Sequence, residues 1–215
     1  RNGSFLVYRR LRQDVPRFRD FLAASANQLR LQPGFENMNP ALLAALLVGR
    51  WPSGASLLQA PSADDSTLGA DRFANNQFAF ANAAPAMNLV PGTRPAGDHI
   101  QSVPGDFDGI MCPRAAHIRK VNPRDLTTDL GDATRTLPRR ILRRGIPFGP
   151  IFPGNGLPDP AQGDRGLLFL SYQTSIRDQF EFLSNTWMNQ LNKPEASDAG
   201  HDLLVGQNPL DPARG

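Results

Sequence analysis

The stretch from residue 105 to 125 reads GDFDGIMCPRAAHIRKVNPRD and concentrates side chains that can do chemistry. Its histidine, His117, stands between two alanines and a run of basic and polar residues. A neutral imidazole can bind a metal ion or exchange a proton near neutral pH. A lone histidine beside apolar residues is more often a hydrogen-bonded core residue, so the residue types leave both interpretations open.

Zinc is a poor candidate for a metal at this position. Structural and catalytic zinc sites draw several ligands from Cys, His and carboxylates. His99 and His201 lie far from His117 in the sequence, and Cys112 is the one cysteine of the chain. Haem iron, by contrast, needs a single axial histidine from the protein. Haem also carries two carboxylates that would suit nearby basic side chains, so the pattern is compatible with haem without requiring it.

Basic residues are concentrated between Arg114 and Arg144, where nine arginines and lysines stand against three aspartates. The net charge of the whole chain is only +3. A local positive field indicates an anionic partner or a solvated basic face. Nucleic acid is disfavoured because the arginines alternate with aliphatic residues and no DNA- or RNA-binding module is recognisable. The basic stretch 137–149 is expected to be extended.

Length and composition favour a globular chain with long loops. The 215 residues include 19 glycines and 20 prolines, which interrupt regular structure. They are frequent between residues 51 and 105, where no periodic pattern is sustained. No apolar run is long enough to cross a bilayer, so no membrane span is expected. A single cysteine fits either redox compartment, and the localisation stays undetermined.

Two strands are predicted over residues 4–11 and 165–173, because both runs are rich in β-forming residues. In the second strand Leu167, Phe169 and Ser171 would point to one face, since side chains alternate along a strand. The combination of these strands with helices suggests an α+β fold.

Three helices are predicted from their end signals. Asp14 caps the first, and the second runs from Asn39–Pro40 to Gly49. Ser175 and Asp178 form a capping box that opens the third, whose apolar stripe ends at Trp187.

Five separated motifs, in order, resemble the dye-decolorizing peroxidases, the haem-dependent DyP-type family. They are NGSFLVYRRLRQDVPRF, LLVGRWPSGASL, CPRAAHIRKVNPRD, RRILRRGIPFG and RGLLFLSYQTSIRDQFEFLSNTW. Five motifs in one order are far more specific than any single motif. The similarity runs through most of the chain and looks closest to the longer, dye-active bacterial and fungal subgroups.

The resemblance implies an α+β, ferredoxin-like fold of the dimeric α+β barrel type, with an antiparallel sheet, packed helices and long irregular loops. Residues 1–50 would form a strand–helix–helix connection to a preceding domain, and residues 51–111 a long irregular loop region. Residues 112–215 would be the haem-binding part of the C-terminal domain. The chain is expected to be the C-terminal portion of such a protein, truncated at both ends, and the upstream G-x-x-D-G motif with the distal aspartate of the family would lie outside it.

The resemblance assigns roles to single residues. His117, in C-P-x-x-A-H, would be the proximal ligand of the iron of haem b. Arg143, in R-x-G-I-P-[FY]-G, would lie on the distal side, where peroxide binds. Asn122 would line the polar edge of the haem, and Leu167 and Phe169 would form a wall of the distal pocket.

Further residues follow from the same motifs. Asp202, in GHDLLVGQ, is similar to a family acid that accepts a hydrogen bond from the proximal histidine. GDFDG at 105–109 has the letters of the distal motif, but it aligns with the loop before C-P, so Asp108 is expected to be a loop residue. Trp187 matches a position that relays electrons, although its helical stripe equally predicts core packing. Phe148 replaces a family tyrosine and cannot form a tyrosyl radical.

The implied activity is that of a haem peroxidase, which reduces hydrogen peroxide and oxidises dyes or phenolic compounds in one-electron steps. The guanidinium of Arg143 would stabilise negative charge on the leaving oxygen. Two alternatives stay open. One is a haem-binding domain without turnover, because the distal aspartate lies outside the chain. The other is a basic interaction domain that binds no haem.

Overall fold

The computed structural model describes residues 3–82, 87–88, 99–100, 102–153, 163–195 and 199–207. The chain divides into two compact units, each built from two stretches of sequence. The first unit consists of Arg1–Leu43 and Pro138–Leu183, and the second of Ala44–Leu137 and Ser184–Gly215. Each unit therefore joins segments that are distant along the chain.

The unit boundaries cut across the ranges 1–50, 51–111 and 112–215 expected from the sequence. Packing in space groups the segments differently from their order along the chain. The three ranges expected from the resemblance stay a prediction.

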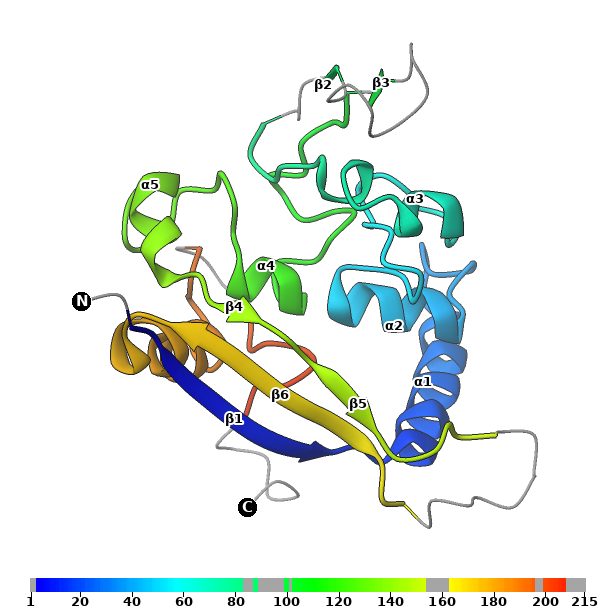
Figure 1. The fold of residues 1–215 in the computed structure, drawn as a ribbon. Helices are drawn as coiled ribbons and strands as arrows, with labels where there is room; N and C mark the ends of the chain where they lie inside the picture. The colour runs from blue at the N-terminus through cyan, green and yellow to red at the C-terminus, as the bar shows by residue number, and fades with distance from the viewer. Residues whose placement is uncertain are drawn as a thin grey trace. The chain divides into compact units, whose positions relative to one another are not determined.

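An antiparallel sheet forms the centre of the first unit (Figure 1). Strand β1 (Phe5–Arg12) pairs with β6 (Gly166–Gln173) along its whole length. On its other side β6 pairs with β4 (Leu142–Arg143) and β5 (Ile146–Phe148). The two strands predicted from residue alternation are confirmed, and the basic stretch expected to be extended supplies β4 and β5.

The helices of the first unit begin at side-chain caps. The Asp14 carboxylate accepts a hydrogen bond from the backbone N–H of Arg17 and opens α1 (Val15–Leu29). The Ser175 hydroxyl accepts from the backbone N–H of Asp178 and opens η3 (Ile176–Glu181), which confirms the predicted capping box. The chain continues as η4 (Leu183–Trp187). Both η3 and η4 have π-type winding, which is wider than the α-helix that the apolar spacing predicts.

Helix α2 (Pro40–Val48) begins with the Asn39 side chain accepting from the N–H of Leu42, as predicted. It ends at Gly49, whose φ of +93° is one that residues other than glycine rarely adopt. A Cβ at Gly49 would also lie only 2.3 Å from Cγ1 of Ile118. Both the turn and the close contact with Ile118 therefore require glycine.

Short elements joined by loops make up the rest of the second unit. They are α3 (Ser66–Ala70), η1 (Ala74–Asn76), β2 (Met87–Asn88), β3 (His99–Ile100), α4 (His117–Val121), α5 (Ala133–Thr136) and, where the chain enters the first unit, η2 (Leu137–Arg139). In the described residues of 51–105 no helix exceeds five residues, which agrees with the expected irregular region. No helix among the described residues is long and apolar enough to cross a membrane.

The second unit has a hydrophobic core that includes Ala116, the residue directly before His117. Its buried members are Leu58, Phe78, Phe80, Val103, Cys112, Ala116 and Leu126. Ala116 is fully buried, while the next side chain, that of His117, keeps 18% of its surface exposed. His117 therefore stands at the border of the core rather than inside it.

Candidate functional site

His117 is held by one short hydrogen bond. It is the first residue of α4, and its Nδ1 lies 2.7 Å from Oδ2 of Asp202. A carboxylate only accepts hydrogen bonds, so Nδ1 carries the proton and donates it. In the neutral ring Nε2 then keeps its lone pair, and no side chain or backbone group among the described residues forms a hydrogen bond with it. This tautomer leaves Nε2 able to bind a metal ion.

Asp202 is fixed by its own turn. Its second oxygen, Oδ1, accepts from the backbone N–H groups of Leu204 and Val205, each at 2.9 Å. The N–H of Leu203 donates to the carbonyl of Ala115, two residues before His117, at 3.1 Å. The carboxylate is buried and all of these contacts lie within the second unit. Asp202 therefore presents a rigid acceptor to the imidazole.

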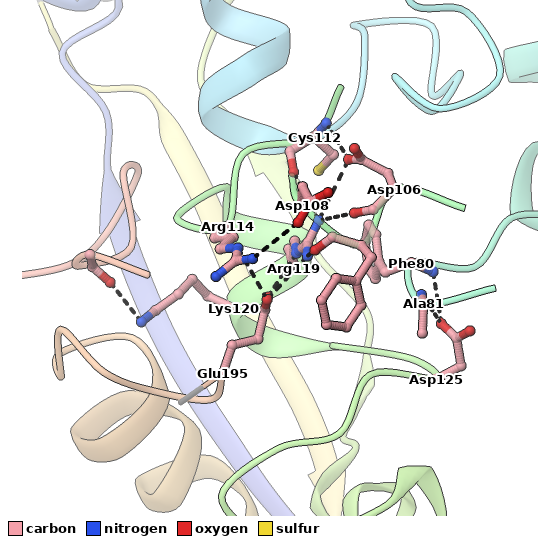
Figure 2. A network of polar contacts seen from close by, with 12 residues as sticks. Phe80, Ala81, Asp106, Asp108, Cys112, Arg114, Arg119, Lys120, Asp125 and Glu195 are labelled. Carbon is pink, nitrogen blue, oxygen red and sulfur yellow. Dashed lines mark hydrogen bonds and ion pairs between the residues drawn. The ribbon is translucent and has the colours of Figure 1, made fainter. Parts of the chain in front are cut away.

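Arg119, two residues after His117, is fully buried. It belongs to the network of polar contacts drawn in Figure 2. Its guanidinium donates to both carboxylate oxygens of Glu195, from Nε at 2.7 Å and from Nη2 at 3.1 Å. It also donates to the carbonyls of Asp106 and Phe107, each at 2.7 Å, and stacks over the ring of Phe80. A buried charge is tolerated when it is paired and hydrogen-bonded in this way. Arg119 thus joins α4 to the loop before it and to Glu195.

Asp106, rather than Asp108, organises the GDFDG loop (Figure 2). The Asp106 carboxylate accepts hydrogen bonds from three successive backbone N–H groups, those of residues 110–112, at 2.8 to 3.1 Å. The Asp108 side chain is 74% exposed and makes a long ion pair, 3.8 Å, with Arg114. Asp108 lies in a loop, as predicted, and the structural role in this motif belongs to its neighbour.

Lys120 is the second fully buried cation of α4. Its Nζ donates to the carbonyls of Gln190 at 2.9 Å and Gly200 at 2.7 Å, and to the carbonyl of Lys193. The charged groups of Arg119 and Lys120 are therefore both paired with groups of the protein itself. The expectation that the basic cluster would suit haem carboxylates is wrong for these two residues, because both are buried and bonded inside the protein. Their partners are distant in sequence, so no local pattern indicated these contacts.

Asn122 ends α4. Its backbone N–H donates to the carbonyl of Ile118 at 3.0 Å, and its side chain is half-buried. The Asn122 amide group forms no hydrogen bond to the part of the chain that the structure describes. The amide is therefore available for a ligand close to the helix that carries His117. Its role at the polar edge of a haem stays a prediction.

Arg143, Leu167 and Phe169 point to one side of the sheet in the first unit. Arg143 lies directly opposite Ser171, and Leu167 and Phe169 precede Ser171 at alternate positions of β6. Directly opposed residues share a face, and so do alternate residues of a strand. The Arg143 side chain is exposed and makes no ion pair within the described residues. The register thus brings the three residues predicted for the distal side to one face.

Trp187 is buried, with 1% of its surface exposed. Its indole N–H donates to Oδ1 of Asp129 at 3.0 Å, and Lys193 pairs with the other oxygen of Asp129 at 3.1 Å. The core packing expected from the helical stripe is confirmed, and an electron-relay role for Trp187 stays a prediction.

No group of three His, Cys, Asp or Glu side chains among the described residues could hold a metal ion by itself.

Comparison with known proteins gives a consistent result. The family model described as "Dyp-type peroxidase, C-terminal" matches residues 93–199. A dye-decolorizing peroxidase of Mycena epipterygia is 39% identical over 192 residues, which cover 89% of this chain and 33% of that protein. One of Auricularia auricula-judae is 36% identical over 216 residues, covering 96% of this chain and 38% of that protein. The chain thus spans between a third and two fifths of these relatives.

Solved structures agree with the sequences. A dye-decolorizing peroxidase in complex with 2,6-dimethoxyphenol superposes with a TM-score of 0.68 at 32% identity, covering 96% of this chain and 42% of that one. A structure of the Auricularia auricula-judae enzyme gives a TM-score of 0.67 at 33% identity, with 96% and 43% covered. These similarities, together with the antiparallel sheet and its helices, confirm the predicted α+β, ferredoxin-like fold class.

Proposed function

The chain belongs to the Dyp-type peroxidase family and matches its C-terminal part, and we propose that it binds haem b through Nε2 of His117. The description of one solved relative names the heme pocket of a dye-decolorizing peroxidase, which agrees with haem as the cofactor of this family. The observation that supports His117 is its 2.7 Å contact with Asp202. A histidine ligand of a metal usually donates its other ring N–H to such a partner, which fixes the ring and raises the basicity of the ligating nitrogen.

The residues of the second unit suit an axial histidine. His117 is partly exposed while its neighbours Ala116, Arg119 and Lys120 are fully buried, so a large ligand could reach the imidazole. Asp202 holds the Nδ1 proton and prevents the tautomer in which Nε2 is blocked. Asn122 would line the polar edge of the same ligand.

Arg143, Leu167 and Phe169 would form the distal side. A guanidinium stays charged at every accessible pH, so Arg143 would hold a fixed positive charge where negative charge develops on the departing oxygen of hydrogen peroxide. Leu167 and Phe169 share its face of the sheet and would exclude water there. Bound haem would supply the iron that accepts the oxidising equivalents of peroxide and passes them on in one-electron steps.

The complete natural protein would use hydrogen peroxide to oxidise dyes or phenolic compounds. The relatives are named for decolorizing dyes, and one solved relative is a complex with 2,6-dimethoxyphenol, which is a phenol. The proposal is tested by peroxide-dependent oxidation of 2,6-dimethoxyphenol. Haem binding without any turnover would instead favour the non-catalytic alternative.

His117 itself is tested by haem titration of the complete natural protein, followed through the Soret band and through cyanide binding. His117→Ala should lose the spectrum of a histidine-ligated haem, because the imidazole that would ligate the iron is removed. His99→Ala is the control of matched residue type and should keep that spectrum. An unchanged Soret band and unchanged cyanide binding in His117→Ala would show that the axial assignment is wrong.

A further inference from the structure

We propose that Lys120 is a positioning residue for His117, because its buried ammonium group holds the segment that carries Asp202. The role in ligation rests on the proposed function, whereas the geometry does not. Lys120 and His117 belong to the same five-residue helix, α4, and Asp202 lies on a separate segment more than 80 residues later. The N–H of Leu203 bonds this segment to Ala115, just before the helix, and Lys120 adds three contacts from within the helix.

The ammonium group of Lys120 binds α4 to residues on both sides of the loop that precedes Asp202. Its acceptors are the carbonyls of Gln190, Lys193 and Gly200, so the three donors of one ammonium meet three backbone acceptors. Gly200 stands two residues before Asp202 and is also bonded through its N–H to the carbonyl of Leu191 at 2.9 Å. Lys120 therefore ties together both ends of the loop that delivers the carboxylate.

Charge strengthens this arrangement. Burial lowers the pKa of Lys120 to about 8, while the charges of Asp202 and Glu195 act in the opposite direction and raise it. At neutral pH the amine therefore remains mostly protonated, with all three protons available. The ammonium of Lys120 and the carboxylate of Asp202 attract each other, which adds to the three hydrogen bonds of the ammonium.

Arg119 provides the internal comparison. It is equally buried and belongs to the same helix, but its hydrogen bonds reach Glu195 and the loop of residues 106–112. No hydrogen bond of Arg119 reaches residues 199–207. Both cations therefore bind the stretch that leads to Asp202, Arg119 at Glu195 and Lys120 at Gln190, Lys193 and Gly200. Of the two, only Lys120 forms a hydrogen bond within residues 199–207.

The decisive experiment measures the tautomer of His117 in the haem-free complete protein by ¹⁵N NMR of the imidazole nitrogens. Lys120→Met should shift His117 from the Nδ1–H tautomer toward the Nε2–H tautomer, because Asp202 is no longer held in place. Arg119→Lys, which keeps a buried cation, should leave the tautomer unchanged. A folded Lys120→Met protein that retains the Nδ1–H tautomer would overturn the proposal.

Lys120→Gln is the second variant and should give a smaller shift in the same direction, because its amide keeps part of the donor set. Failure of both Lys120 variants to fold, while Arg119→Lys folds, would also overturn the proposal, since Lys120 would then support the whole unit rather than one contact. The tautomer measurement needs no haem, so it tests the role of Lys120 even if the protein does not bind haem.

With haem bound, Lys120→Met and Asp202→Asn should both lower the iron–histidine stretching frequency seen by resonance Raman. Affinity for haem should fall about 10-fold, the lower end of the loss when a partner of a metal-binding histidine is disturbed. The double variant should resemble Asp202→Asn alone, because both changes act through one hydrogen bond. Fully additive effects on the stretching frequency would contradict a role through Asp202.

Discussion

Nδ1 of His117 and Oδ2 of Asp202 lie 2.7 Å apart, although 85 residues separate them in the chain. The contact gives the imidazole one orientation and one tautomer. It also places a full negative charge next to the ring, which makes the opposite nitrogen a stronger electron donor. This pair is therefore the part of the proposed site whose chemistry can be altered most cleanly.

Asp202→Asn should leave a histidine-ligated haem of lower electron density at the iron. The reduction potential should rise and the rate of reaction with hydrogen peroxide should fall about 10- to 100-fold, the usual effect of losing such a partner. Spectroelectrochemistry and stopped-flow mixing with peroxide measure the two quantities. Asp108→Asn, at an exposed acid, is the control, and equal effects in both variants would contradict the role of Asp202.

Arg143→Leu in the complete natural protein should slow the reaction with hydrogen peroxide about 100- to 1,000-fold, as expected when one preorganised donor to a developing oxyanion is removed. Haem binding should change little. Arg144→Leu is the matched control, because the adjacent residue points to the opposite face of the sheet. The distal role fails if the two variants react with peroxide at the same rate.

Asp106→Ala should destabilise the protein by about 3 kcal/mol, because one buried and two part-buried backbone N–H groups lose their acceptor. Asp108→Ala should change the free energy of unfolding by less than about 0.5 kcal/mol, as is usual for an exposed side chain. Urea unfolding compares the two. A larger loss for Asp108→Ala would reverse the roles assigned within GDFDG.

Asp125 should make stability depend on pH in the acid range. Burial raises the pKa of its carboxyl, but the backbone N–H groups of residues 80–82 together outweigh burial and hold the pKa below the ordinary 3.8. The folded state then favours the carboxylate, so the contribution of Asp125 to stability is complete above about pH 4 and is lost as the pH falls through the lowered value.

The difference in urea midpoint between the wild type and Asp125→Asn measures this contribution. It should be constant from about pH 5 to pH 7 and shrink as the pH falls below the ordinary carboxyl range, because the wild-type carboxyl takes up a proton at its lowered pKa. A difference that grows on acidification would have the wrong sign and would rule out the hydrogen-bonded carboxylate as its source.

Local patterns were sufficient for the framework. Alternation predicted β1 and β6, and the caps at Asp14 and Ser175 marked where two helices begin, because both signals depend on neighbours in sequence. The alternation in β6 also placed Leu167 and Phe169 on one face, which the strand register bears out.

The buried charges around α4 could not be predicted in the same way. HIRKV reads as a basic, solvated stretch, yet Arg119 and Lys120 are fully buried. Their partners, Glu195 and three carbonyls, lie 70 to 80 residues away, and a sequence of one chain carries no sign of such pairings. Asp202 was reached through the resemblance to a family, since nothing in its own spacing singles it out.

The distance along the chain between α4 and its anchors also sets an order of events during synthesis. A ribosome releases His117 well before it releases residues 190–202, so the histidine first exists without its acceptor, and both buried cations exist without their partners. The imidazole can take its final tautomer only when the last part of the second unit has closed over α4. Uptake of an axially ligated cofactor would thus come late, as a step that follows completion of the chain's own architecture.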